Sequence, residues 1–335
     1  MKKTLSMILF TIMLVLTACG EGQQVPKQPT GKTAGGLEKV QLMLDYTPNT
    51  NHTGLYVAQE LGYFAEEGLE VEIIAPAQSG TTASVATNNI QFGISVQENI
   101  TLARVAGLPV VSLAAIIQHN TSGFASPVEK NITTPKDFEG KIYGGWGSPI
   151  EQATIHSIMK ADDADFNQLS IINMGDAEFF SAVKRDIDFA WIYYAWTGIE
   201  AELRNEQLNM IYLQDYDQAL DFYTPVVITN ETMINENSEQ VHKFMRAVKK
   251  GYEFAIEKPE EAADLLLKAV PDLNPELVKA SQKWLATRYQ DDASYWGEQK
   301  LSVWQGYADW MFEHGFLEAE LDAEKAFTNQ FISGE

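Results

Sequence analysis

The sequence predicts an α/β protein that folds as two lobes with a ligand cleft between them. Short apolar runs alternate with helical patterns from residue 40 onward, the alternation restarts near residue 125, and the chain beyond residue 238 reads as almost continuous helix. Such alternation is typical of a parallel, doubly wound sheet. We therefore expect lobe 1 at residues 37–124 plus 226–335 and lobe 2 at residues 125–225, joined by extended crossings near residues 125 and 225.

The first unit is predicted to hold four buried strands separated by three helices. Gly62 ends the first helix, and the run Gly107-Leu108-Pro109 ends the third. The predicted strands are Val40–Leu44, Val71–Ile74, Phe92–Ser95 and Val110–Ile117, and the predicted helices are Thr53–Leu61, Ser84–Asn88 and Asn99–Ala106.

The second unit repeats this pattern, and the chain then returns to complete the first lobe. Its predicted strands are Lys141–Gly144, Ser170–Met174, Asp188–Ile192 and Met210–Leu213, and its predicted helices are Thr134–Phe138, Ile150–Lys160, Ala177–Lys184 and Tyr194–Asn205. A return strand is expected at Val226–Thr229. The final helices are predicted at Ser238–Glu257, Pro259–Ala269, Pro275–Thr287 and Leu301–His314.

The N-terminus has the pattern of a secretory signal. Lys2 and Lys3 precede an apolar run from Leu5 to Leu16, which is too short to span a membrane comfortably. The run Leu16-Thr17-Ala18-Cys19 then matches the bacterial lipobox. We expect residues 1–18 to be a lipoprotein signal peptide, cleaved before a Cys19 that carries a lipid. The alternative is an ordinary signal peptide with a chance cysteine.

Cys19 is the only cysteine of the chain, so no intramolecular disulfide, catalytic thiol or cysteine-bound metal can form. Residues 19–36 are rich in Gly, Pro, Gln and Lys and are expected to be a flexible tether. Together these features predict a soluble domain held by a lipid on Cys19 at the extracytoplasmic face of the cell membrane.

The charge balance excludes one class of partner. The chain has 46 Asp and Glu against 24 Lys and Arg, a net charge of −22. Because nucleic acids are bound by basic surfaces, we expect no nucleic-acid partner. The five histidines are scattered without metal-ligand spacing, and no Ser-His-Asp arrangement stands out. We expect no bound metal and no cofactor.

Ligands of open α/β sheets bind beyond the carboxyl ends of the strands, which selects the loops to inspect. The loop after the first strand offers a carboxylate, a ring, an amide and an imidazole at Asp45, Tyr46, Asn49 and His52. We expect these four to contact a ligand. The alternative is a polar turn in which an Asn or Thr caps the next helix and His52 stabilises the turn.

Two further loops offer polar or aromatic groups. Gln97 and Glu98 follow the third strand and could hydrogen-bond a polar heterocycle, or could begin a helix with an acidic first turn. The turn Gly144–Pro149 opens a helix, where backbone N–H groups are unpaired, and it carries Trp146. It has no GK[ST] run and is therefore not a nucleotide P-loop.

The stretch FAWIYYAWTGIE, residues 189–200, crowds five rings into eight positions beside a glutamate. Phe189 is expected in the core, and the rest at the carboxyl end of a strand. Rings above and below a ligand, each worth about 0.5–1.5 kcal/mol, with a carboxylate at its edge, suit a flat heterocycle bearing amino groups. The expected contacts are Trp191, Tyr193, Tyr194, Trp196 and Glu200. Core rings and a solvated glutamate are the alternative. At the second crossing, Tyr223 could reach the ligand or support the hinge.

A family resemblance is carried by the lipobox and by three stretches, LDYTPNTNHTGLYVAQELGYFAEEGLEVEI, QFGISVQENITLARVAGLPV and FYTPVVITNETMINENSEQVHKFMRAVKKGYEFAIEKPEEAA. Together they resemble bacterial ABC-transporter solute-binding lipoproteins for thiamine pyrimidine precursors. The resemblance implies a type II periplasmic-binding-protein fold, a monomer that closes on formylaminopyrimidine or hydroxymethylpyrimidine, and delivery to separate permease and ATPase subunits. Family members usually have a tryptophan where this chain has Tyr46.

The same fold also serves fungal pyrimidine synthases, which are enzymes. They carry a histidine where this chain has Asn99, and a cysteine-rich run near the region of residues 222–227, which has no cysteine here. We therefore expect a binding protein and not an enzyme. GYFAEEGLEVE is also shared with binders of riboflavin, sulfonates and nitrate, which leaves another solute open. A ligand-free structural lipoprotein is the remaining alternative.

Overall fold

The computed structural model describes residues 36–175 and 177–333, which belong to one compact unit, Lys32–Glu335. The predicted signal peptide, the lipid site Cys19 and the predicted tether, apart from Gly36, lie outside the described residues. Within the described part of the chain, no helix is both long and apolar enough to cross a bilayer.

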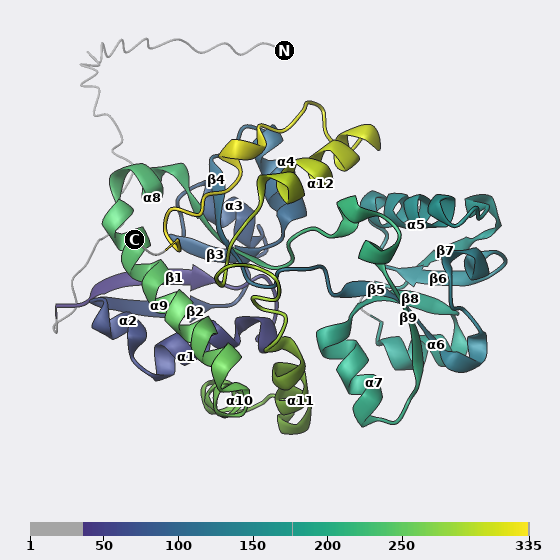
Figure 1. The fold of residues 1–335 in the computed structure, drawn as a ribbon, viewed down its shortest axis with the longest axis horizontal. Helices are drawn as coiled ribbons and strands as arrows, with labels where there is room; N and C mark the ends of the chain where they lie inside the picture. Colours follow the sequence, from purple (N-terminus) through teal and green to yellow (C-terminus); the bar gives the residue numbers. More distant parts are fainter. Residues whose placement is uncertain (1–35, 176, 334–335) are drawn as a thin grey trace, which may run out of the picture. The chain divides into compact units, whose positions relative to one another are not determined.

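Five strands form the first sheet, in the order β2-β1-β3-β10-β4 (Figure 1). β1 pairs in parallel with β2 and β3, and β10 runs antiparallel between β3 and β4. All five predicted strands of this lobe are confirmed to within a few residues. Their bounds are β1 Glu38–Met43, β2 Leu69–Ile74, β3 Phe92–Ser95, β4 Val110–Ala115 and β10 Val226–Asn230.

Five further strands form the second sheet, in the order β7-β6-β8-β5-β9. β6 pairs in parallel with β7 and β8, whereas β5 runs antiparallel to β8 and β9. Their bounds are β5 Ser122–Pro127, β6 Ile142–Gly145, β7 Ser170–Asn173, β8 Phe189–Tyr193 and β9 Leu208–Tyr212.

The expectation of wholly parallel sheets was wrong, because β5 and β10 run against their neighbours. Each is the first strand after a crossing between the sheets. Parallel neighbours need a crossover connection, usually a helix. Here the chain crosses from β4 to β5 without a helix, and from β9 to β10 through two short 3-10 helices, Leu213–Asp215 and Gln218–Leu220. Each crossing strand pairs antiparallel to its neighbours. The predicted lobe limits near residues 125 and 225 stay a prediction. The chain enters the second sheet at β5 and returns to the first sheet at β10.

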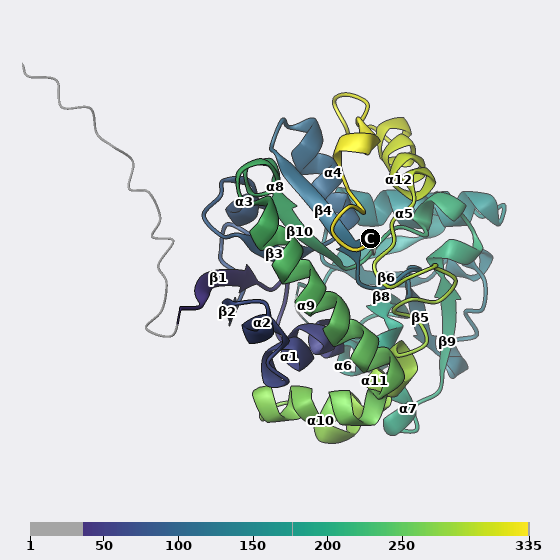
Figure 2. The ribbon, with the colours of Figure 1, turned by 60° about the vertical axis from the view of Figure 1, so that its left-hand side comes forward.

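Helices cover both faces of the first sheet (Figures 1 and 2). α1 packs on α9, where a Cβ on Gly251 would overlap the carbonyl oxygen of Gly54. On the same face Phe92 of β3 stacks on Phe244 of α9, 3.8 Å between ring centroids. The sequence patterns did not predict α2 or α8. The helix predicted at Ser84–Asn88 begins three residues earlier, as α3. The bounds are α1 Thr53–Glu60, α2 Tyr63–Glu66, α3 Thr81–Ala86, α4 Gln97–Val105, α8 Glu231–Glu236, α9 Ser238–Glu257, α10 Pro259–Ala269, α11 Pro275–Leu285 and α12 Leu301–Glu313.

The helices of the second sheet are fewer and shorter. α5 buries Ile155, Ile158 and Met159 in the same core cluster as Phe124 and Phe189. The predicted helix from residue 194 is replaced by a π-helical turn, Tyr194–Gly198, followed by one short α-helix, α7. The bounds are α5 Pro149–Ala161, α6 Phe179–Arg185 and α7 Ile199–Leu203.

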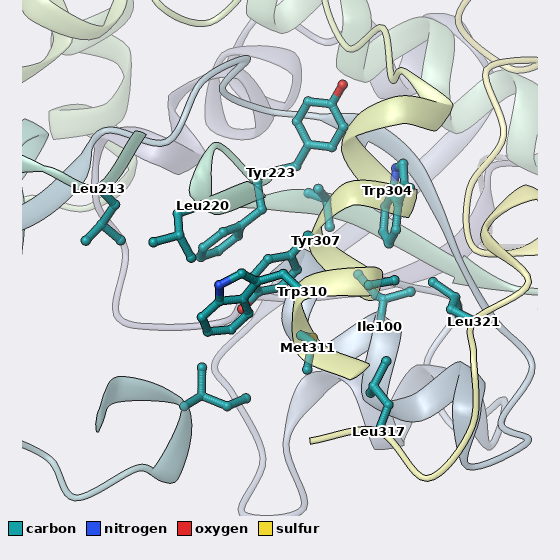
Figure 3. Packing of buried hydrophobic residues seen from close by; sticks show 14 of the residues in the cluster. Ile100, Leu213, Leu220, Tyr223, Trp304, Tyr307, Trp310, Met311, Leu317 and Leu321 are labelled. Carbon is teal, nitrogen blue, oxygen red and sulfur yellow. The ribbon is translucent and has the colours of Figure 1, made fainter. Parts of the chain in front are cut away.

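Helix α12 and the two crossings join the sheets. Tyr307 of α12 stacks on Phe222 of the second crossing, 4.2 Å apart, and Trp310 donates from Nε1 to Ser157 Oγ of α5 at 3.3 Å. Figure 3 shows Tyr307 and Trp310 pointing from α12 toward Leu220. The crossings themselves are tied by His119 Nδ1 and Asp221 Oδ2, 2.6 Å apart. One hydrophobic cluster therefore continues from the first sheet into the second.

Candidate functional site

The loop after β1 holds a carboxylate against a buried imidazole. Asp45 follows the strand, and its Oδ1 lies 2.8 Å from Nε2 of His52, a side chain with no exposed surface. Asn49 caps the short 3-10 helix Thr50–His52 by accepting the Asn51 N–H at 2.9 Å. Tyr46 is 67 % exposed. Asp45 and Tyr46 are therefore accessible, while Asn49 and His52 shape the turn.

A pocket of about 480 Å³ opens at the carboxyl ends of β1, β2 and β3. It is lined by Asp45, by residues 76–80 and the first turn of α3, and by Ser95 and Asn99. Thr82 Oγ1 and Ser95 Oγ lie 2.6 Å apart, which links α3 to β3. None of the described lining residues is Lys or Arg. The pocket thus presents carboxylate, amide and hydroxyl groups.

Sequence reasoning missed residues 76–83 as part of the site. The rule that selects the loops after β1 and β3 also selects the loop after β2, because all three strands are parallel and end at one edge. The run PAQSGTT, with a glycine and small hydroxyl residues at the strand end, is the signal that could have found it.

The loop after β3 divides into a structural and an accessible residue. Gln97 is fully buried and satisfied, since its Oε1 accepts the Tyr223 N–H at 2.8 Å and its Nε2 donates to Val303 O at 3.1 Å. Glu98 is partly exposed, and burial raises its pKa although the buried Tyr307 hydroxyl donates to it at 3.3 Å. Gln97 therefore ties the second crossing to α12, and Glu98 is available to a ligand.

Tyr193, at the end of β8, interacts with groups outside its own sheet. Its side chain is 44 % exposed, yet the surrounding protein desolvates the phenol and raises its pKa to about 12. A hydrogen bond with Thr224 opposes this shift, and the carboxylates of Glu98 and Asp45 add to it. Tyr193 therefore lies within electrostatic reach of both carboxylates, although Asp45 follows β1 and Glu98 is in the first turn of α4.

Two tryptophans lie next to each other at the same end of the second sheet. Trp191 is on the same face of β8 as Tyr193, and its ring centroid is 5.4 Å from that of Trp146, which is 50 % exposed. Trp191 Nε1 is buried and has no hydrogen-bond partner among the described residues. Along this face exposure rises from the fully buried Phe189 to Tyr193.

A buried glutamate missed by sequence reasoning holds the Trp146 turn. Glu151, in the first turn of α5, is 1 % exposed, and its Oε2 accepts the Trp146 N–H at 3.0 Å. Burial raises its pKa, opposed by the N–H groups of Trp146 and Gly147. Gly145 is required beneath it, because a Cβ there would overlap the carboxylate. An acidic residue three positions into a helix is a common N-terminal cap.

The three remaining residues of the aromatic stretch have other neighbours. The ring of Tyr194 lies 5.2 Å from that of Trp284 of α11, and its hydroxyl donates to Glu202 at 2.5 Å. Trp196 packs against the apolar cluster around Tyr56 and Leu266. Glu200 forms a partly exposed ion pair with Arg204, 3.4 Å apart. The predicted ligand contacts of Tyr194, Trp196 and Glu200 stay predictions, and these neighbours do not support them.

Tyr223 has a structural neighbourhood as well. It is 1 % exposed, its hydroxyl accepts the Lys300 N–H at 2.9 Å, and burial raises its pKa to about 12. The structure thus brings Tyr193 within electrostatic reach of Asp45 and Glu98, and it places Trp146 beside Trp191, which shares a strand face with Tyr193. Tyr46 is exposed beside Asp45.

Comparison with known proteins places the chain in a family. Residues 49–262 match the model of the family described as NMT1/THI5 like. The formylaminopyrimidine-binding protein of Halalkalibacterium halodurans is 32 % identical over 88 % of this chain and 90 % of its own length. The chain belongs to the NMT1/THI5-like family.

Relatives in the NMT1/THI5-like group carry names of both binders and enzymes. The riboflavin-binding protein RibY of Chloroflexus aurantiacus is 23 % identical over 96 % of both chains. A 4-amino-5-hydroxymethyl-2-methylpyrimidine phosphate synthase of Legionella pneumophila is 24 % identical over 88 % of this chain and 92 % of its own. Family membership alone therefore leaves the choice between binder and enzyme to the residues of the site.

Solved structures establish the fold of this NMT1/THI5-like chain. The periplasmic aliphatic sulphonate-binding protein SsuA of Escherichia coli superimposes with a TM-score of 0.68 over 86 % of this chain and 91 % of its own, at 13 % identity. The predicted type II periplasmic-binding-protein fold with two lobes is thereby confirmed. In the described part of the chain, no group of three or more His, Cys, Asp or Glu side chains is arranged to hold a metal ion.

Proposed function

We propose that this protein is the extracytoplasmic, lipid-anchored substrate-binding protein of an ABC importer and carries a thiamine pyrimidine precursor, formylaminopyrimidine or hydroxymethylpyrimidine. The position of Tyr193 carries the proposal: it extends from the second sheet to within electrostatic reach of Asp45 and Glu98 at the edge of the first. A flat ligand between these groups would contact both lobes.

The chemistry of the site suits an aminopyrimidine. The exposed rings available to it are those of Tyr193 and Trp146, and Tyr46 is a further exposed ring beside Asp45. Trp191 is partly buried next to Trp146. Asp45 and Glu98 offer carboxylate oxygens to exocyclic amino groups, each such bond contributing about 1.5–3 kcal/mol. Since no Lys or Arg is found among the described residues that line the pocket, an anionic solute such as a sulfonate is disfavoured.

The transport mechanism would be closure of the two lobes around the ligand. A ligand that contacts both lobes binds the closed state better than the open one and shifts the population toward it. The closed form would then be recognised by a permease, with an ATPase on its other side. The 32 % identity to a formylaminopyrimidine-binding protein supports a role in solute transport. The carboxylates of Asp45 and Glu98 near the ring of Tyr193 support the class of ligand.

Calorimetry with four ligands tests the proposal. Formylaminopyrimidine or hydroxymethylpyrimidine should give saturable heat, quench tryptophan fluorescence and raise the melting temperature. Riboflavin, the ligand in the name of one relative, and an alkanesulfonate should give neither heat nor a thermal shift. Saturable binding of riboflavin or the sulfonate, with none of the pyrimidines, would contradict it.

Two further measurements test the carrier role and the anchor. The pyrimidine recovered after denaturing the complex should have an unchanged mass, and so should the protein chain, whereas a synthase-type reaction would alter one of them. The anchor is tested by expression of the full-length chain in bacteria with a radiolabelled fatty acid. Label should enter wild type and be absent from C19A; equal labelling of both would rule out a lipid on Cys19.

A further inference from the structure

We infer that His52 is a positioning residue: it fixes the carboxylate of Asp45 so that only one oxygen, Oδ2, is presented to the ligand, in one direction. This inference rests on the proposed function, because it concerns the same pocket. It assigns His52 a role other than direct ligand contact.

The hydrogen bonds of the imidazole define which nitrogen carries the hydrogen. The backbone N–H of Asn49 donates to Nδ1 of His52 at 3.2 Å, so Nδ1 is an acceptor. Nε2 therefore carries the hydrogen and donates to Asp45 Oδ1 at 2.8 Å. One side of the ring closes the cap of the short helix, and the other side holds the carboxylate.

The imidazole has no freedom to turn away. His52 has no exposed surface, and the turn that carries it is held by the hydroxyls of two buried tyrosines, one in α9 and one in the segment after α11. Tyr252 donates to Asn51 O at 2.7 Å, and Tyr289 donates to Thr50 O at 2.6 Å. The backbone around His52 is thus fixed on both sides.

The second oxygen of Asp45 is left for a ligand. The side chain of Asp45 is 25 % exposed and lines the pocket at the strand ends. Among the described residues, no hydrogen-bond donor reaches its Oδ2. A carboxylate fixed through one oxygen presents an acceptor of fixed direction, which suits a single N–H donor on the rim of a planar ligand. A site built for such a donor strongly rejects analogues that lack it.

A double-mutant cycle in the full mature chain tests this role, with formylaminopyrimidine and hydroxymethylpyrimidine as probes. H52L should raise the Kd about tenfold, the size expected for losing one hydrogen bond to a carboxylate. D45A should raise the Kd at least as much, and the double variant should equal D45A. H52Q, whose amide can both accept and donate, should restore the Kd to within about threefold of wild type.

S112A is the matched control, because it removes a buried hydrogen bond elsewhere in the first sheet, from Ser112 Oγ to Gln299 Oε1 at 2.7 Å. It should lower the melting temperature and leave the Kd unchanged. A wild-type Kd in H52L, or additive effects of H52L and D45A, overturns the inference.

A ligand-free readout separates this inference from the proposed function. Nitrogen-15 correlation spectra of wild type should show His52 with its hydrogen on Nε2, and the hydrogen bond to residue 45 should be lost in D45A. A hydrogen on Nδ1 overturns the positioning role whatever the ligand. Correct spectra combined with no pyrimidine binding to wild type would instead contradict the proposed function alone.

Discussion

Tyr193 and Glu98 lie on different sheets, yet the Glu98 carboxylate adds to the rise that desolvation causes in the pKa of the Tyr193 phenol, to about 12. A tyrosine at the end of β8 and a glutamate in the first turn of α4 are therefore within electrostatic reach of each other. The hydroxyl stays protonated at any ordinary pH and can donate a hydrogen bond. Ring, donor and acceptor are thus available together where the two sheets come near each other.

Removing the hydroxyl of Tyr193 should weaken ligand binding more than it weakens the fold, because the native state loses only the hydrogen bond with Thr224. Y193F should raise the Kd for the pyrimidine about five- to tenfold, consistent with loss of one ordinary hydrogen bond. Y223F is the matched control, because the Tyr223 hydroxyl accepts the Lys300 N–H in the second crossing. Y223F should lower the free energy of unfolding by about 1 kcal/mol and change the Kd little. Calorimetry and urea denaturation on both variants check this. A raised Kd in Y223F, with an unchanged Kd in Y193F, would instead assign Tyr223 to the ligand.

The ionised Glu98 carboxylate should lower the stability of the fold at pH 7 and strengthen ligand binding. Burial raises its pKa, so the native state holds its proton more tightly than the unfolded chain does. The free energy of unfolding therefore falls as pH rises from the ordinary glutamate value through the raised one. E98Q cannot ionise, so it should melt higher than wild type at pH 7, with the gap closing below about pH 4. It should also raise the Kd about tenfold. A lower melting temperature at pH 7 would contradict this.

His119 should stabilise the crossings at neutral pH and lose this effect in alkali. Its hydrogen bond with Asp221 raises its pKa from 6.5 to about 9, with the nearby carboxylates adding to the rise and burial opposing it. The contribution is fully present below pH 6.5 and is lost as pH rises through 9. Since 36 % of the side chain is exposed, H119N should cost only about 1 kcal/mol at pH 6. Denaturation of both proteins from pH 6 to pH 10 checks this; a constant difference would exclude the ion pair as its cause.

Helices α1 and α9 should tolerate no side chain at their closest approach. A Cβ on Gly251 would overlap a backbone oxygen, that of Gly54, which cannot rotate away. G251A should therefore lower the free energy of unfolding by about 1–3 kcal/mol. Gly306 in α12 has open space around its Cβ position, so G306A should be stabilising by about 0.5–1 kcal/mol. Chemical denaturation measures both; equal effects would contradict the packing explanation.

The strands and long helices could be predicted because their patterns are local. Short apolar runs such as Val40–Leu44 and the strong periodicity of Ser238–Glu257 identify elements without knowledge of the fold. Strand direction is not local: whether Val226–Thr229 runs with or against its neighbours depends on the path of the chain between sheets. The short helices α2 and α8 were missed because four to six residues carry too little periodicity.

The candidate site was predicted in its loops but not in every side chain. Asp45, Glu98 and Trp146 lie in loops selected by the strand-end rule, and the structure leaves them accessible. Gln97 and Tyr223 could not be separated from them, because a polar residue after a strand can point either way and only packing decides. Trp196 and Glu200 were expected on one helical face, but the π-helical turn before α7 changes the phase of that face.

The position of β10 has a consequence for how the polypeptide acquires its structure. β10 lies between β3 and β4, so the N-terminal half of the chain cannot complete its own sheet until residues beyond 225 have been synthesised. The other sheet is built from the continuous segment 122–212 and needs no later residue. Long-range pairing of this kind is slow, and domains made from continuous segments assemble as units. The middle of the chain should therefore reach its native form before the beginning does.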